Sequence, residues 1–296
     1  MSFSLILQYL FSGITTGGIY AIVAIGFNII YNTTGIINFA QGEFVMLGGM
    51  IAVSLCPYMP LPAAIVCAVA ITALVGALIE FVFIRWLKNP NVLQMVIITI
   101  GLSILIREAA LHIWDEKVRS LPYFTGSEIS SIRLGGAYIS PQVLWVLFTC
   151  AAIVVCLNLF FSFTLTGRSM RACSANRTAA ALCGINVRNM VTLSFMISAA
   201  IGALAGCVMS PITQTSYDCG APLAIKGFTV AILGGLGNSN GAVAAGLLLG
   251  AIEAFSVSLL PMAYKDVITI TILLLALFLR PTGLFGSREA GKLREF

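Results

Sequence analysis

Long runs of apolar residues, separated by short polar segments, constrain the fold of this chain more than any other feature. Hydrophobic residues make up 59% of the 296 residues and charged residues 9%, whereas a soluble domain has about 25% charged residues. A helix needs about 20 apolar residues to cross a bilayer, and the strict alternation of a membrane β-barrel is absent. The sequence therefore predicts an all-α polytopic membrane protein.

The apolar runs give a first estimate of the number of transmembrane helices. The run 223–237 is the shortest, so it either crosses at a tilt or re-enters from one side. We expect about 8–9 transmembrane helices in one domain, residues 1–296, with broken helices and an inverted-repeat-like core. The N-terminus lacks a basic segment and is expected to be a retained helix. The nine runs are 8–31, 36–55, 61–85, 92–113, 140–164, 191–211, 223–237, 241–260 and 264–280.

Basic residues are distributed unevenly between the polar segments. The connection 166–190 contains four arginines and no acidic residue, the junction 85–90 is basic, and so is the tail 281–296, whereas basic and acidic residues balance in the loop 114–139. The positive-inside rule places the basic segments in the cytoplasm and the balanced loop outside. Nine crossings then put the N-terminus outside and the C-terminus inside. The same rule accounts for the net charge of +5 without a nucleic-acid partner.

Two stretches rich in glycine and amides interrupt the apolar sequence. They are "INFAQGEFVMLGGM" in the first half and "LGGLGNSNGAVAAGLLLGAIEAF" in the second. Paired glycine-interrupted segments are typical of a transporter's central site, because broken helices are tolerated only inside protein or beside water. The alternative is that both are plain surface turns. The candidate substrate-pathway residues are Asn38, Gln41, Gly42, Glu43, Gly235, Gly237 and Asn238.

Ionisable residues inside the apolar runs are few, and each is costly in hydrocarbon. We expect Glu80 to pair with Arg85 near the inner surface, and Arg107 with Glu108 to form a structural pair near the outer one. Glu43 and Glu253 follow broken segments, so they are either functional groups or polar bonds between helices. The full set is Glu43, Glu80, Arg107, Glu108 and Glu253.

Motifs of catalysis, metal binding and nucleotide binding are missing. The sequence has no Walker A motif, no zinc-protease motif and no nucleophile-elbow motif, and a single histidine, His112, cannot form a proton relay. Its eight cysteines form no C-x-x-C pair, so no metal or redox site is predicted. A disulfide between Cys207 and Cys219 stays open as the less favoured alternative. We expect no catalytic residue, no metal and no cofactor.

Small residues recur four positions apart at Gly13/Gly17, Gly202/Gly206 and Gly246/Gly250. This spacing indicates tightly packed helices or a seam between two copies.

The long basic connection provides a candidate docking element. Ser169 to Leu182 is alanine-rich and predicts a helix, which Gly184 should end in the C′ position. A short exposed helix of this kind could dock a separate ATPase, whereas the alternative is a helix that lies on anionic lipid. The candidate docking residues are Arg171, Asn176, Ala179, Ala180, Leu182, Gly184 and Ile185.

Four segments, in order over nearly the whole chain, resemble one protein family. They are "GIYAIVAIGFNIIYNTTGIINFAQGEFVMLGG", "GRSMRACSANRTAAALCGINV", "KGFTVAILGGLGNSNGAVAAGLLLGAIEA" and "RPTGLFG". These resemble the smaller of the two inner-membrane permeases of branched-chain amino acid ABC transporters. The family commonly has His at the position of Gln41, and Gln cannot titrate near neutrality.

The resemblance implies a bacterial inner-membrane permease subunit that moves branched-chain or other hydrophobic amino acids. Its implied partners are a second related permease subunit, two cytoplasmic ATPase subunits that bind the ATP, a periplasmic solute-binding protein and membrane lipid. The alternatives are import of urea or short-chain amides by the same machinery, an autonomous channel, and a membrane enzyme. The missing catalytic motifs weigh against an enzyme, and the docking element weighs against an autonomous channel.

Overall fold

The computed structural model describes residues 3–87, 91–127, 130–134, 137–258, 261, 264–280 and 283–285. It is nearly all helical. The first half comprises α1 (Phe3–Thr34), α2 (Gln41–Leu55), α3 (Leu61–Ile79) with the π-helical turn η1 (Glu80–Ile84), α4 (Val92–Trp114), and strands β1 (Ile132–Leu134) and β2 (Ala137–Ile139). The second half comprises α5 (Pro141–Phe163), α6 (Leu165–Ala175), α7 (Arg177–Leu182), α8 (Val187–Thr213), α9 (Gly220–Gly234), α10 (Ser239–Ser256) and α11 (Lys265–Leu279).

Each of the nine predicted runs contains a helix, in the predicted order. Within the described residues, six helices are long and apolar enough to cross a membrane: α1, α3 with η1, α4, α5, α8 and α10. Helices α2 and α9 are shorter apolar helices of 15 residues each. The run 36–55 is helical only from Gln41, because residues 36–40 belong to a break between α1 and α2.

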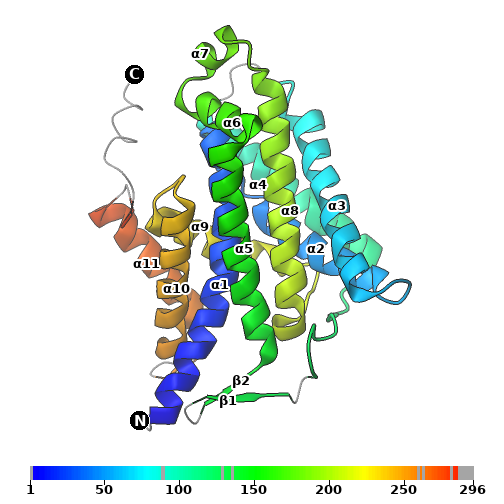
Figure 1. Cartoon of the computed structure of the whole chain (residues 1–296), viewed down its shortest axis with the longest axis vertical. Helices are drawn as coiled ribbons and strands as arrows, with labels where there is room; N and C mark the ends of the chain where they lie inside the picture. The colour runs from blue at the N-terminus through cyan, green and yellow to red at the C-terminus, as the bar shows by residue number, and fades with distance from the viewer. Residues whose placement is uncertain are drawn as a thin grey trace.

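The helices lie roughly along the long axis of the molecule, and the polar segments gather at its two ends (Figure 1). Helices α6 and α7 lie at one end, whereas the antiparallel hairpin β1–β2 lies at the other end, near the N-terminus. The hairpin belongs to the loop 114–139, with Ile132 opposite Ile139. Of the tail 281–296, residues 281–282 and 286–296 lie outside the described residues.

Helix α1 forms the centre of the bundle. Its residues from Gly17 to Ile30 are all buried, and it packs against α8, α9 and α10. Helices α3, α4 and α5 are peripheral and expose large apolar side chains such as Leu74, Ile97 and Phe148. The surface of the bundle is therefore apolar, as expected for contact with lipid or with other membrane subunits.

Glycines of α1 and α10 allow the two antiparallel helices to touch along their backbones. A Cβ atom on Gly17 would lie 2.5 Å from the carbonyl oxygen of Gly246, and one on Gly250 would lie 2.3 Å from that of Gly13. Gly206 of α8 makes a similar contact with Val45 of α2. The predicted small-residue pairs therefore form seams within one chain.

Two expected ion pairs are absent from the described residues. The Glu80 carboxylate accepts a hydrogen bond of 2.6 Å from Thr192, whereas the Arg85 guanidinium lies over the ring of Phe81, 5.1 Å from its centre. Arg107 and Glu108 form no salt bridge with each other in this part of the chain. Packing of α8 supplies the partner of Glu80. Arg107 and Glu108 are adjacent in sequence, so their side chains diverge on the helix surface.

All eight cysteines are free thiols. The Cys207 thiol is buried near the C-terminal end of α8 and donates to the carbonyl oxygen of Gly48 at 3.5 Å, so the alternative of a Cys207–Cys219 disulfide is not realised.

The glycine seam leads to a stability prediction. We expect Gly17→Ala and Gly250→Ala each to lower the free energy of unfolding by about 1–3 kcal/mol, because the added methyl group forces α1 and α10 apart. Gly101→Ala is the matched control, since a Cβ there meets nothing within 4 Å. Thermal unfolding followed by size-exclusion chromatography in detergent measures the effect. Equal midpoints for all three variants would contradict the seam.

Candidate functional site

The break between α1 and α2, residues 35–40, folds back into the bundle. Gly35 adopts a φ of 68° and donates its N–H to the carbonyl of Tyr31 at 2.7 Å. Asn38 then pairs the next backbone groups: its side-chain oxygen accepts from Ala40 N at 3.1 Å, and its carbonyl accepts from Gln41 N at 3.1 Å. These bonds satisfy the backbone of a broken helix that is buried in protein.

Gln41 links three helices at the start of α2. Its side-chain Nε2 donates to the carbonyl of Ser198 at 3.2 Å, and the Ser198 hydroxyl lies 2.6 Å from Gln41 Oε1 and 2.8 Å from the carbonyl of Gly26. A Cβ on Gly26 would lie 2.1 Å from Gln41 Nε2. Gln41 is therefore fully buried, and through Ser198 it links α2 to α8 and α1.

The N-termini of α2 and α9 meet beside the Glu43 carboxylate. A Cβ on Gly42 would lie 2.0 Å from the carbonyl oxygen of Gly220, and one on Gly220 would lie 2.5 Å from Glu43 Oε2. The positive ends of both helix dipoles therefore face an acidic group. Ser103 of α4 donates to Glu43 Oε1 at 2.8 Å.

Two buried polar atoms near this junction have no hydrogen-bond partner among the described residues. They are Oε2 of Glu43 and Nδ2 of Asn38. Both side chains are almost completely inaccessible to solvent. Unpaired buried polar atoms are costly and rare in native structures. The region of the α1–α2 break therefore has one hydrogen-bond acceptor and one donor available for a ligand.

Residues 235–238 form the break between α9 and α10, which is held by two asparagines of α1. Asn28 accepts from Gly237 N at 3.0 Å and donates to the carbonyl of Asn238 at 3.2 Å. Asn32 donates to the carbonyl of Gly237 at 2.9 Å, and Asn238 caps α10 by accepting from Gly241 N at 3.0 Å. Sequence reasoning missed both partners, although two amides inside an apolar run were a signal.

The segment 283–285 closes the same break from the other side. Leu284 N donates to the carbonyl of Leu233 at 2.7 Å, and Asn238 donates to the carbonyl of Phe285 at 3.1 Å. Gly283 packs so closely that a Cβ would lie 2.4 Å from the carbonyl of Ile232.

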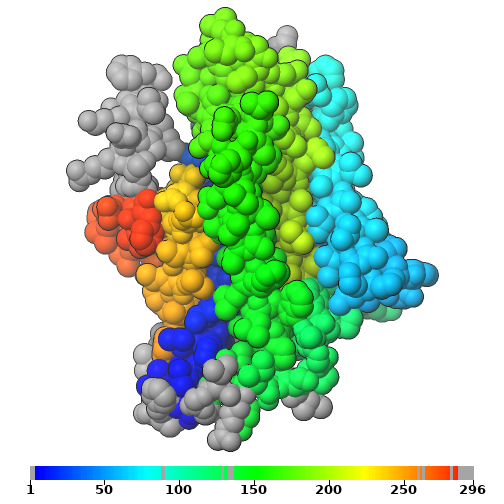
Figure 2. All heavy atoms as spheres, viewed as in Figure 1, coloured from blue at the N-terminus to red at the C-terminus, as the bar shows by residue number. Residues whose placement is uncertain are grey.

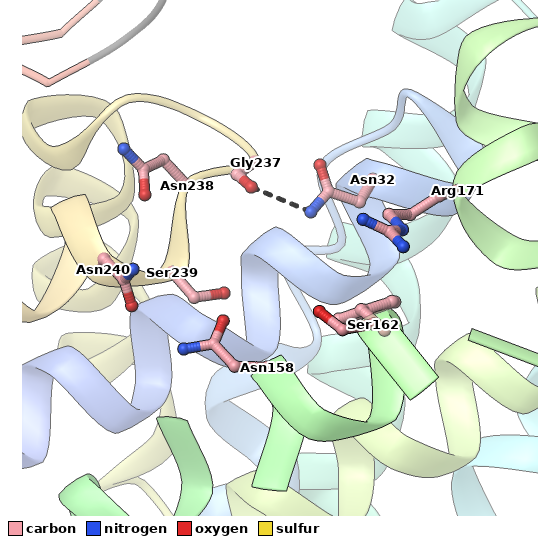
Figure 3. Close-up of a pocket in the computed structure, with 9 residues that line it drawn as sticks. Asn32, Asn158, Ser162, Arg171, Gly237, Asn238, Ser239 and Asn240 are labelled. Atoms are coloured by element: carbon pink, nitrogen blue, oxygen red, sulfur yellow. Dashed lines mark hydrogen bonds between the residues drawn. The ribbon is translucent and has the colours of Figure 1, made fainter. Parts of the chain in front are cut away.

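A polar pocket of about 220 Å³ opens next to the α9–α10 break. Figure 3 shows the side chain of Arg171 beside Asn32, on the far side of the pocket from Asn238 and Asn240. The pocket brings two candidate pathway residues, Gly237 and Asn238, together with the candidate docking residue Arg171, and residues 38–43 do not line it. Its lining residues are Asn32, Asn158, Phe161, Ser162, Arg171, Gly237, Asn238, Ser239 and Asn240.

The predicted helix from Ser169 to Leu182 is two helices, because Asn176 breaks it. Asn176 is extended, with φ −158°, and its side chain caps α7 by accepting from Ala179 N at 2.9 Å. The prediction for Gly184 is confirmed: with φ 83° it donates to the carbonyl of Ala181 at 3.0 Å, while Ile185 N donates to that of Ala180 at 3.1 Å. This is a Schellman motif.

Helix α7 is exposed on one face and attached on the other. Leu182 is 85% exposed, whereas Ala180 is 4% exposed. The Arg177 guanidinium donates to the carbonyl of Thr34, the last residue of α1, and burial lowers the pKa of Arg177 from its ordinary value. The tip of the docking candidate is therefore bonded to the end of the central helix.

Glu253 is fully buried and lies in a charge cluster that joins α1, α9, α10 and α11 and reaches the surface at Asp266. It pairs with Lys226 at 3.5 Å and Lys265 at 3.2 Å, and it accepts from the Tyr20 hydroxyl at 2.8 Å. Lys226 also pairs with Asp266 at 3.0 Å. The interpretation of Glu253 as a polar bond between helices is therefore supported, because a buried charge needs such partners. The sequence analysis did not identify Lys226 and Lys265 as the partners of Glu253.

The asparagine bonds of α1 lead to a second prediction. Asn28→Ala leaves Gly237 N and the carbonyl of Asn238 without their partner, so we expect a loss of about 1–3 kcal/mol in unfolding free energy for each group. Asn158→Ala is the matched control, since its exposed side chain forms no hydrogen bond with the described residues. Thermal unfolding in detergent compares the stability of the two variants. An equal loss of stability in Asn158→Ala would refute the role assigned to Asn28.

Comparisons with known proteins identify the family of this chain. The model of the family "Branched-chain amino acid transport system / permease component" matches residues 9–277. The chain is 35% identical to the high-affinity branched-chain amino acid transport system permease protein BraD of Pseudomonas aeruginosa, over 97% of both chains. It is 33% identical to the corresponding permease protein LivH of Escherichia coli, again over 97% of both.

The fold also has a counterpart among solved structures. PsaBC from Streptococcus pneumoniae, in complex with a Fab, gives a TM-score of 0.50 at 13% identity, covering 95% of this chain and 94% of that chain. This likeness concerns the fold alone. With a family model that matches most of the chain and relatives that match it end to end, this multi-pass membrane protein belongs to the family of branched-chain amino acid transport permeases.

Proposed function

We propose that this chain is the permease subunit of an ABC importer for branched-chain or other hydrophobic amino acids. The observation that supports it most is the match over 97% of the chain to permeases named for high-affinity branched-chain amino acid transport. The chain itself is not an enzyme in this proposal. It holds no catalytic site and no cofactor, and its partner subunits bind and hydrolyse the ATP.

The proposed partners are a second, related permease subunit, two cytoplasmic ATPase subunits and a periplasmic solute-binding protein. The exposed apolar side chains of α3 and α4 offer surfaces for lipid and for the second permease. Helix α7, with Leu182 exposed at the end of the bundle, offers one for an ATPase. Gly184 and Ile185 fix the end of this docking helix through the Schellman motif.

The proposed topology has nine crossings, with the N-terminus outside and the C-terminus in the cytoplasm. Helices α2 and α9 are too short to cross alone, and the adjoining breaks, 35–40 and 214–219, supply the remaining depth inside protein. The whole chain, 1–296, is then one permease domain with an external loop at 114–139, a cytoplasmic docking loop at 166–190 and a cytoplasmic tail at 281–296.

We also propose an inverted repeat, in which α1–α2–α3 corresponds to α8–α9–α10. In both units a long helix is followed by a break and then by a helix of 15 residues. Helix α3 packs on α8 while α10 packs on α1, and the N-termini of α2 and α9 adjoin each other. In this repeat the α1–α2 break corresponds to the α8–α9 break. The glycine-rich sequence pattern instead matches the α1–α2 break with the α9–α10 break.

In the proposed mechanism, the junction of α2 and α9 is where an amino acid passes. Separation of the two helix N-termini would expose the open oxygen of Glu43 to a substrate ammonium group, and would expose backbone N–H groups to its carboxylate. Binding here need only be weak, because a transporter must release its substrate. The bond from Arg177 to Thr34 offers a direct route by which movement of α7 reaches the end of α1.

The transport proposal is tested by uptake. The chain is co-expressed with two ATPase subunits, a second permease and a binding protein of the same transporter class, and the complex is reconstituted into liposomes. We expect ATP-dependent uptake of labelled leucine but not of urea. Urea uptake without leucine uptake would show that the substrate is an amide.

The docking assignment makes a prediction in the same assay. Ala180→Leu should leave the complex folded but reduce leucine uptake per ATP hydrolysed by about tenfold or more, because the larger side chain displaces α7 from its seat. Ala175→Leu is the control, since Ala175 is exposed on α6. Unchanged coupling in Ala180→Leu would rule out α7 as the docking element.

The pathway assignment makes another prediction. In a variant without other cysteines, Asn38→Cys should be protected from a water-soluble maleimide at rest, because position 38 is 1% exposed. It should become reactive during ATP turnover. Tyr58→Cys, 86% exposed in the connection between α2 and α3 and away from α7, should react in both states. Protection of position 38 in both states would make the break purely structural.

A further inference from the structure

An apolar groove of about 460 Å³ lies on the outer face of the bundle between α5 and α10, over α1. The space-filling view shows α5 in green beside α10 in gold on this face (Figure 2). Small side chains form its floor, notably Gly18 and Ala151, which leaves room for an elongated ligand. Its lining residues are Gly18, Leu147, Cys150, Ala151, Val154, Val155, Asn240, Val243 and Leu247.

The apolar groove adjoins the polar pocket, because Asn240 lines both. On α5 the two share no residue: the groove ends at Val155, and the polar pocket continues with Asn158 and Ser162. From Ser162 down to Leu147 the two cavities extend about 22 Å along the helix axis. The surface therefore changes from polar to apolar in the direction from the α6–α7 end toward the middle of the bundle.

The polar pocket has unused hydrogen-bond capacity and a positive charge. Among the described residues, Arg171 has no acidic partner and no hydrogen-bond acceptor. The side chains of Asn158, Ser239 and Asn240 make no hydrogen bond in this part of the chain either. No acidic residue lines the pocket. A guanidinium beside amide and hydroxyl donors is suited to an anionic oxygen group such as a phosphate.

We propose that the polar pocket and the apolar groove together form one binding site for an anionic phospholipid of the inner leaflet. The headgroup phosphate binds Arg171 and the neighbouring amides, and an acyl chain lies in the groove toward Leu147. This inference rests on the proposed orientation, which places the α6–α7 end in the cytoplasm, and it is independent of the substrate.

A lipid explains the combined features better than a helix of the second permease does. An apolar transmembrane helix could cover the groove, but it would leave the Arg171 charge without a counter-ion. A free anion could occupy the polar pocket, but it would leave the groove unused. Because the pocket touches α6 and residues 237–240 together, a bound headgroup would join the docking element to the α9–α10 break.

Native mass spectrometry of the assembled transporter, taken from nanodiscs of phosphatidylglycerol and phosphatidylcholine, tests the site. We expect the wild-type transporter to retain phosphatidylglycerol in preference to phosphatidylcholine. Arg171→Gln should weaken retention about tenfold or more, through loss of a charge-assisted hydrogen bond. Ala151→Trp should do the same by filling the groove.

Two controls make the result specific. Arg188→Gln removes an exposed arginine of α8 outside the pocket, and Leu159→Trp enlarges an exposed residue of α5 outside the groove. Both should retain phosphatidylglycerol as wild type does, so equal loss in the controls overturns the site. Loss in Arg171→Gln but not in Ala151→Trp would show that the acyl chain lies outside the groove and overturn the combined site. Wild type that retains no phosphatidylglycerol but binds inorganic phosphate through Arg171 would identify a free-anion site and overturn the lipid. Protection of Ala151→Cys from a lipid-soluble maleimide in the complex, but not in the isolated subunit, would identify the second permease as the occupant and also overturn it.

Discussion

Pairing of the backbone at helix breaks is the requirement on which the rest of this structure depends. Inside a membrane protein, an interrupted helix exposes N–H and C=O groups that water cannot reach. Asn38 pairs those of the α1–α2 break, and Asn28, Asn32 and Asn238 pair those of the α9–α10 break. Because these amides fix where the chain turns, they also fix where α2 and α10 begin and where α9 ends.

Close backbone packing brings the amides within reach of the breaks. Helix α1 can donate from Asn28 and Asn32 to residues 237–238 only because glycines let α10 lie directly against it. The same central helix ends at Thr34, which Arg177 contacts from α7. One rigid helix thus joins the exposed docking element, the α9–α10 break and the buried core.

The helical runs and the end of α7 at Gly184 could be predicted, because apolar periodicity and C′ glycine are local properties. The partners of the breaks could not, because Asn28 and Gly237 are separated by most of the chain. The split at Asn176 was missed because alanine-rich sequence favours one helix, whereas a cap contributes about 1 kcal/mol and here outweighs that preference. Glu80 accepts from Thr192 and does not pair with Arg85 for a different reason: tertiary packing brings a donor of α8 close to it.

The charge cluster around Glu253 is electrically balanced. Lys226 and Lys265 carry two positive charges, and Glu253 and Asp266 carry two negative charges. Displacing one elementary charge through a membrane potential of 100 mV costs about 2.3 kcal/mol. Because these four charges sum to zero, α9, α10 and α11 can shift together without moving net charge through the field. A joint movement of this part of the bundle would therefore be insensitive to membrane voltage.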